Sequence, residues 1–187
     1  MTLKLVWGLT GSGDKMPETL EVVAAIRESE DVQITAALSK AALQVMRWYK
    51  LYERLEEAVD HVLIEKDANA PFIVGRLQIG EFDGFIVAPA TANTVAKIVH
   101  GIADTLISNA VAQTNKTDLP VYVMPVDREP GITRTVLPNG DEFTLRIREV
   151  DVENARRLAA MPGIEVLSAP GDIRRAVDDY RIRMEAG

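Results

Sequence analysis

Short apolar runs alternate with amphipathic segments along most of the chain. Near-continuous apolar runs predict buried strands over residues 3–9, 32–38, 82–88 and 120–125. Apolar positions at helical spacing predict helices over residues 16–28, from about residue 41, and over residues 94–113, where Gly101 is the point at which the last would break. Strands without strict alternation, separated by helices, are typical of a parallel sheet covered on both faces. We therefore predict an α/β fold.

The last third of the chain has a different pattern. Two β-rich runs, residues 132–137 and 143–147, flank Pro138-Asn139-Gly140-Asp141. Asn-Gly between such runs predicts a hairpin whose two turn residues both adopt positive φ. We expect a β-hairpin arm at about residues 132–147, and then a helix over 152–160, a strand over 164–167 and a final helix over 172–184. A chain of 187 residues is expected to form a single domain, residues 1–187.

Composition excludes several classes of function. The absence of cysteine excludes disulfides, thiolate nucleophiles and a protein-ligated iron–sulfur cluster. Two histidines, His61 and His100, are too few for a His-rich metal site, so we predict no bound metal. The net charge of −7 argues against a nucleic-acid partner. No apolar run reaches the length of about 18 residues that a membrane span needs, and the start does not resemble a signal peptide. We expect a cytoplasmic protein.

Two loops at predicted strand ends carry candidate anion-binding groups. Residues 8–14, Gly-Leu-Thr-Gly-Ser-Gly-Asp, follow a strand and open a helix, so glycine backbone and hydroxyl groups can approach a phosphate. The spacing matches neither a dinucleotide fingerprint nor a Walker loop, and a simple Gly-rich turn is the alternative. Ser39 ends the second strand. Its favoured role is the N-cap of the next helix, which is compatible with phosphate binding.

A third loop, residues 88–94, also joins a strand to a helix. Its small residues leave room for a flat ring, and Thr91, Asn93 and Thr94 supply compact polar groups. The motif Pro-Ala-Thr-Ala-Asn-Thr at residues 89–94, with Ala-Lys-Ile-x-x-Gly-Ile-Ala-Asp after it, resembles the flavin motif of the homo-oligomeric flavin-containing Cys-decarboxylase family. The resemblance covers residues 3–125.

This resemblance implies a fold, a cofactor and an assembly. The fold is a doubly wound parallel sheet, Rossmann-like or flavodoxin-like, with helices on both faces, to which this chain adds the hairpin arm. Members form trimers or assemblies of trimers, of 12 or 24 subunits, with FMN at subunit contacts. The resemblance implies that the FMN site is lined by Gly11, Ser12, Gly13, Ser39, Pro89, Ala90, Thr91, Asn93 and Thr94.

Departures from the family pattern narrow the activity. The decarboxylases carry a catalytic His at a place that corresponds to residues 75–77, which here are Gly-Arg-Leu. Their substrate clamp, Pro-x-Met-Asn-x-x-Met-Trp, is replaced after Pro125 by Val-Asp-Arg-Glu-Pro-Gly. The prenyltransferase branch has Ser-Met-Lys-Thr at the flavin motif, where this chain has Ala-Thr-Ala-Asn-Thr at residues 90–94. Both activities are therefore disfavoured.

The Asn139-Gly140 hairpin and residues 161–166 resemble a redox branch, the archaeoflavoproteins and the acceptor-type dihydromethanopterin reductases. This resemblance implies an FMN-dependent oxidoreductase that reduces dihydromethanopterin to its tetrahydro form with electrons from a separate redox protein. An FMN electron carrier without its own substrate stays open, and a decarboxylase with a rearranged site is the less favoured alternative. The motifs assign no catalytic residue.

Two hypotheses concern the substrate side. In the first hypothesis, the hairpin arm folds over the flavin face and shapes a pterin pocket. Arg128, Arg134 and Arg146 would then bind an acidic tail of the substrate, although we favour the interpretation that they are ordinary surface arginines. The aromatic-rich stretch that contains Met46, Trp48, Tyr49 and Tyr52 is interpreted as a core or interface helix. In the alternative interpretation, one of these side chains stacks on the flavin ring.

Overall fold

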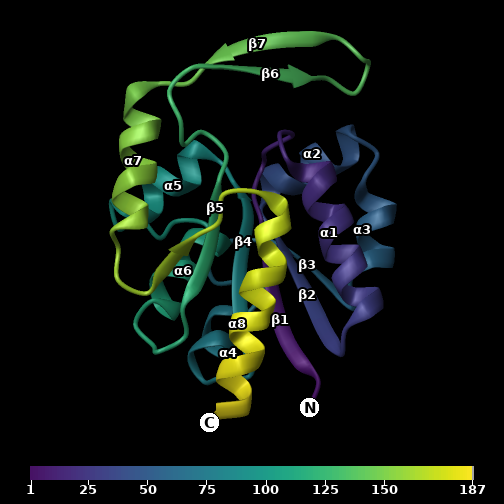
Figure 1. Ribbon diagram of the computed structural model, residues 1–187, viewed down its shortest axis with the longest axis vertical. Helices are drawn as coiled ribbons and strands as arrows, with labels where there is room; N and C mark the ends of the chain where they lie inside the picture. Colours follow the sequence, from purple (N-terminus) through teal and green to yellow (C-terminus); the bar gives the residue numbers. More distant parts are fainter. Residues whose placement is uncertain (187) are drawn as a thin grey trace.

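The computed structural model describes residues 1–186 and is built around a six-stranded parallel sheet (Figure 1). The strand order is β3-β2-β1-β4-β5-β8, so the chain winds outward from β1 in one direction and then crosses to the other side. This arrangement confirms the predicted doubly wound α/β fold. The strands are β1 Leu3–Leu9, β2 Val32–Leu38, β3 His61–Ile64, β4 Gly84–Ala90, β5 Val121–Pro125 and β8 Ile164–Val166.

Helices cover both faces of the sheet, as predicted. One face packs against α1 Met16–Ser29, α2 Lys40–Trp48, α3 Tyr52–Ala58 and α8 Ile173–Ala186. The other packs against α4 Val74–Gln78, α5 Ala92–Val99, α6 Leu106–Thr114 and α7 Glu149–Ala159. Side chains along β1 alternate between the two, because Leu5 and Trp7 belong to the first buried cluster and Val6 to the second. Both faces of a strand are therefore apolar, which explains the near-continuous runs.

Most element boundaries agree with the sequence pattern, and the exceptions have local causes. The helical pattern over residues 94–113 is broken near Gly101, as its sequence suggested: α5 ends at Val99, α6 begins at Leu106, and Gly101 between them adopts φ +69°. The α3, β3 and α4 elements were not predicted. Strand β3 has four residues, none of them fully buried, so it produces no apolar run. Helix α4 has only five residues, which is too short for a periodic signal.

The predicted hairpin arm is present and stands over the carboxyl ends of the sheet strands (Figure 1). It consists of β6 Ile132–Val136 and β7 Glu142–Arg146 in antiparallel register. The turn differs from the expected one. Gly140 adopts φ +89° and Asn139 does not adopt a positive φ. The Leu137 N–H donates to the Asp141 carbonyl (2.8 Å) and the Gly140 N–H donates to the Leu137 carbonyl (2.8 Å), so a three-residue loop, residues 138–140, replaces a two-residue turn.

Within residues 1–186, no helix combines the length and the apolar character that crossing a membrane requires.

Candidate functional site

The loops after β1 and β4 meet where the winding of the sheet reverses. The Thr10 hydroxyl donates to the Pro89 carbonyl (2.8 Å) and accepts from the Thr91 N–H (2.9 Å). These bonds join two of the three loops that the sequence singles out. In open α/β sheets, ligands bind at this switch point, outside the carboxyl ends of the strands. Thr10 is 2 % exposed. It was not predicted as a site residue, although its place between a strand and a glycine turn was a usable signal.

Hydroxyl caps begin two helices at the same edge of the sheet. Ser39 is the N-cap of α2 and accepts from the Ala42 N–H (3.0 Å), which confirms the cap interpretation. Thr91 caps α5 and accepts from the Thr94 N–H (3.2 Å). Both helix N-termini therefore point toward the edge where an anion is favoured.

The first loop lies against the start of α2 at Gly11 and against the Tyr49 side chain, after the end of α2, at Gly13. A Cβ on Gly11 would lie 2.6 Å from the Ala41 Cβ, and a Cβ on Gly13 would lie 2.6 Å from the Tyr49 Oη. The Ser12 hydroxyl donates to the Asp14 carbonyl (3.1 Å). Packing against Ala41 thus requires glycine at position 11 and holds the loop at the N-terminus of α2, whereas the contact at Gly13 is with the end of a movable side chain.

A cavity of about 340 Å³ lies between these loops and the hairpin arm. Its size falls within the range of small-molecule sites. One wall comes from the loop residues, another from the end of α2, and a third from the chain after β5 and the hairpin. The lining residues are Gly11, Ser12, Gly13, Asp14, Val45, Trp48, Tyr49, Thr91, Val126, Asp127, Thr133, Thr135, Leu137, Phe143 and Leu145.

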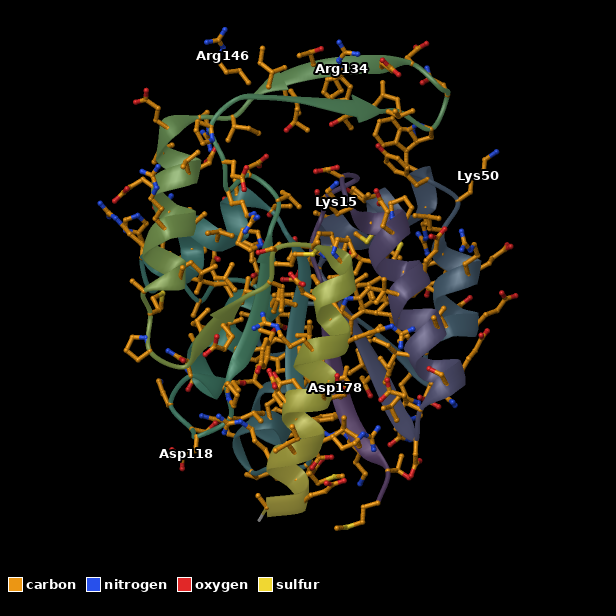
Figure 2. The ribbon with its side chains drawn as sticks, viewed as in Figure 1. Lys15, Lys50, Asp118, Arg134, Arg146 and Asp178 are labelled. Atoms are coloured by element: carbon orange, nitrogen blue, oxygen red, sulfur yellow. The ribbon has the colours of Figure 1, made fainter. Side chains whose placement is uncertain are left out.

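The hairpin presents different residues to its two sides. Cross-strand pairs Thr133–Leu145 and Thr135–Phe143 line the cavity. Because side chains alternate along a strand, Arg134 and Arg146 lie on the opposite side and extend away from the body of the molecule (Figure 2). Arg128 donates to the Ser168 hydroxyl (2.9 Å). Arg134 and Arg146 therefore do not line this cavity and are exposed, in agreement with the favoured interpretation of them as ordinary surface arginines.

The aromatic stretch after β2 divides between the core and the cavity. Met46 is fully buried, as the core-helix interpretation expects. Trp48 and Tyr49 line the cavity instead, with their rings 5.6 Å apart in an edge-on arrangement. Trp48 is 57 % exposed. These two side chains give the cavity an aromatic wall next to the glycine loop.

Four predicted site residues, Gly11, Ser12, Gly13 and Thr91, line the cavity together. The other predicted residues lie beside it. Pro89 and Ala90 are part of β4, and Ser39 and Thr94 are engaged at the helix caps. Asn93 is exposed on the first turn of α5.

Two carboxyl groups that the sequence did not single out face the same cavity. Burial raises the pKa of Asp14, and Glu18 adds to the rise, while Lys15 opposes it. Burial also raises the pKa of Asp127, reinforced by the nearby carboxylates of Asp151 and Asp14 and opposed by Arg148. Neither Asp14 nor Asp127 stood out in the sequence, because one follows a glycine turn and the other follows a strand, in places where aspartate is common.

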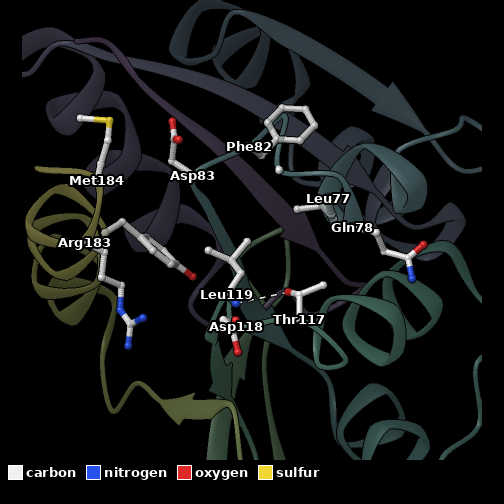
Figure 3. Close-up of a pocket in the computed structure, with 11 residues that line it drawn as sticks. Leu77, Gln78, Phe82, Asp83, Thr117, Asp118, Leu119, Arg183 and Met184 are labelled. Carbon is white, nitrogen blue, oxygen red and sulfur yellow. Dashed lines mark hydrogen bonds between the residues drawn. The ribbon is translucent and has the colours of Figure 1, made fainter. Parts of the chain in front are cut away.

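The histidines and the opposite edge of the sheet take no part in this cavity. His61 begins β3, and His100 is the exposed C-cap of α5. A shallow depression at the amino edge is lined by residues such as Leu77, Phe82 and Leu119 (Figure 3). The Tyr180 hydroxyl there is already bonded to the Phe85 backbone and the Pro120 carbonyl. The candidate site is therefore the cavity under the hairpin.

A doubly wound sheet with a cavity at its switch point, bounded by a glycine loop, capped helices and aromatic rings, defines a protein that binds a nucleotide-like cofactor. The chain belongs to the Flavoprotein family, whose model matches residues 1–184. Family membership confirms that the expected cofactor is a flavin.

Named relatives agree with this assignment. The chain is 50 % identical to the uncharacterized protein MJ0730 of Methanocaldococcus jannaschii, with 94 % of each covered. It is 29 % identical to the dihydromethanopterin reductase (acceptor) of the same organism, covering 92 % of this chain and 95 % of that one. Its structure resembles that of Burkholderia xenovorans DmrB in complex with FMN, a cubic protein cage for redox transfer, with a TM-score of 0.82, 29 % identity and 98 % of each chain covered.

Proposed function

We propose that this protein is an FMN-dependent oxidoreductase that reduces dihydromethanopterin to tetrahydromethanopterin with electrons from a separate redox protein. The names of the relatives support the reaction class. The observation that carries the proposal is the cavity between the glycine loop and the hairpin. It offers polar groups for a phosphate at one end and apolar walls for flat rings at the other.

We propose that FMN enters with its phosphate toward Gly11, Ser12, Gly13 and Ser39. The Ser39 oxygen already accepts a bond from its own helix, so its hydroxyl proton is free to donate to a phosphate. The segment from Pro89 to Thr94 would place the Thr91 and Asn93 side chains near the polar edge of the ring, with Pro89, Ala90 and Thr94 holding the backbone. When bound, the flavin supplies the electron-transfer chemistry.

The hairpin favours a substrate pocket over a plain electron carrier. A carrier needs only an accessible ring edge, whereas here Phe143 and Leu145 form an apolar wall on the side away from the sheet. Such a wall would cover one side of a flat ring bound in the cavity. An FMN carrier without its own substrate is the alternative. A decarboxylase is disfavoured further. Arg76 stands where the decarboxylases carry their catalytic His, and its guanidinium is paired with Glu81 (2.6 Å).

We propose that residues 1–187 act as one domain with the arm as an appendage, and that copies assemble as trimers into a 12- or 24-subunit particle. Asn93 belongs to the flavin motif and yet is exposed, which fits a site completed by a neighbouring copy. The proposed location is the cytoplasm, where the pterin and a reduced carrier protein would both be present.

The test is anaerobic visible spectroscopy. The purified protein is reduced chemically and mixed with dihydromethanopterin. Return of the oxidised flavin spectrum supports the reductase. A flavin that stays reduced with the pterin but is oxidised by a redox protein supports the carrier instead. A colourless protein that takes up no added FMN contradicts the proposed site.

A further inference from the structure

Two carboxyl groups line the cavity, and only that of Asp127 lacks a hydrogen-bond donor in the part of the chain that the structure describes. A backbone hydrogen bond from Lys15 lowers the pKa of Asp14. Among residues 1–186, no side-chain or backbone donor contacts the carboxyl oxygens of Asp127. Both are partly buried and both line the cavity. An incompletely solvated carboxyl without a partner is costly for folding, so its retention points to a role in the site.

The neighbouring Asp151 shows the contrast. It is buried, and Arg148 holds it with two bonds of 2.8 and 2.7 Å. This pair stands at the start of α7 and satisfies the Arg148 charge locally. Arg148 therefore does not pair with Asp127, although it lies close enough to oppose the rise in the pKa of Asp127.

Asp127 is better placed than Asp14 to serve a substrate. It follows β5, on the side of the cavity that continues into the hairpin, together with Val126. Asp14 belongs to the glycine loop, where the cofactor phosphate is proposed to bind. A negative charge on Asp14 would repel that phosphate. The charged groups that face Asp127 from neighbouring elements are Asp14 from the first loop and Asp151 and Arg148 from α7.

We infer that the Asp127 carboxyl is the proton donor to the substrate in the reduction of a C=N bond next to the flavin. This inference rests on the proposed function. When bound, the reduced flavin anion would supply the hydride that the carbon accepts as the C=N π bond opens. The nitrogen takes the proton from the Asp127 carboxyl. The products are oxidised flavin, a saturated CH–NH unit and the Asp127 carboxylate, which regains a proton from water.

The raised pKa of Asp127 is consistent with this role, because a raised pKa keeps part of the population protonated closer to neutral pH. The like charges of Asp14 and Asp151 disfavour the carboxylate. The rate of substrate reduction should therefore fall as the pH rises through the pKa of Asp127.

The experiment compares Asp127→Asn, Asp127→Glu and the remote control Asp118→Asn as FMN-loaded proteins. Each is reduced and then reoxidised either by dihydromethanopterin or by ferricyanide, which takes one electron and no proton. We expect Asp127→Asn to slow reoxidation by the pterin on the order of 100-fold, with the ferricyanide rate within about twofold. Asp127→Glu should recover part of the pterin rate and its pH dependence, and Asp118→Asn should match the parent.

A second readout does not depend on turnover. Carbon-13 NMR of aspartate carboxyls in the unloaded protein should show a resonance that titrates above the ordinary range and disappears in Asp127→Asn. Asp14→Asn should lower the midpoint of that resonance, because it removes one of the repelling charges.

The outcomes separate the two proposals. If the parent protein is not reoxidised by the pterin, the proposed function fails and this inference fails with it. If the parent is reoxidised and Asp127→Asn performs equally well, only the proton donor is wrong. If Asp127→Asn loses FMN, or loses both reoxidation rates together, Asp127 binds the cofactor and the inference is overturned.

Discussion

The Tyr49 hydroxyl donates a hydrogen bond of 3.0 Å to the Val136 carbonyl and so connects the end of α2 to the hairpin. The two residues are 87 positions apart in the sequence. All residues of β6 and β7 are exposed or half-exposed, so the hairpin has no buried side chain that would hold it in place. Its position over the cavity therefore depends on a few contacts of this kind.

Replacing Tyr49 with Phe should loosen the arm without unfolding the sheet. The loss of one hydrogen bond is worth about 1 kcal/mol, so opening of the arm should become about fivefold more frequent. Hydrogen exchange of the segment 132–147, followed by mass spectrometry, measures this opening. Tyr52→Phe is the matched control, because Tyr52 lies on α3 and packs against the core. Equal exchange in the Tyr49→Phe and parent proteins would show that the bond does not hold the arm.

Deleting residues 133–146 and joining the ends with a short Gly-Ser linker should separate cofactor binding from substrate turnover. The groups proposed to bind the FMN phosphate lie outside the arm, so the protein should still bind FMN. Reoxidation by dihydromethanopterin should be lost, because one apolar wall of the pocket is gone. Turnover that survives the deletion would contradict the proposed pocket. Thermal unfolding of the variant should match the parent, since the arm contributes no residue to the core.

Thr10→Val should weaken the connection between the loops after β1 and β4. Valine has nearly the same shape as threonine and removes both bonds of the hydroxyl, leaving the Pro89 carbonyl and the Thr91 N–H without that partner. We expect a cost of about 1–3 kcal/mol in the free energy of unfolding, measured in urea, and weaker FMN binding. Thr10→Ser keeps the hydroxyl and should retain most of the stability. A Thr10→Val protein as stable as the parent would show that the loops are held by other contacts.

The two glycines of the first loop should respond differently to alanine. A Cβ on Gly11 meets the Ala41 Cβ and backbone, which cannot move without moving α2. A Cβ on Gly13 meets the far end of the Tyr49 ring, which can turn away. Gly11→Ala should therefore reduce stability and FMN affinity more than Gly13→Ala. Adding Tyr49→Ala should restore stability to Gly13→Ala but not to Gly11→Ala, and a rescue of both would contradict this packing.

Glu65→Ala should affect two helices at once. The buried Glu65 carboxylate accepts from the Lys40 N–H of α2 (2.9 Å) and from the Leu106 N–H of α6 (3.1 Å). Loss of a helix cap costs about 0.5–2 kcal/mol, so the alanine variant should lose more stability than a single cap accounts for. Glu65→Gln keeps one acceptor oxygen and should lie between alanine and the parent. Urea unfolding of the three proteins measures the order.

The sheet was predictable because both of its faces are covered. Continuous apolar runs such as residues 3–9 have few alternatives to a buried strand, and loops at strand ends placed Gly11, Ser12, Gly13 and Thr91 correctly at one edge. Strand β3 was not predicted, because a partly exposed edge strand of four residues has no continuous apolar run.

The cavity walls were harder to predict because they depend on contacts between distant segments. Asp127 and Tyr49 acquire their places only when the chain after β5 and the end of α2 meet beneath the hairpin. Strand alternation predicts that Arg134 and Arg146 share one face of the arm. The sequence does not show which face of the arm lies toward the cavity.

The arm, whose strands bury no residue, has an evolutionary consequence. Changes in Thr133, Thr135, Phe143 or Leu145 alter the pocket without repacking the hydrophobic interior on which folding depends. Mutations there carry little risk of unfolding the scaffold. Under the proposed function, these four positions can therefore change the substrate preference while the residues proposed to hold FMN stay the same, so new acceptors are most readily acquired by changing the hairpin.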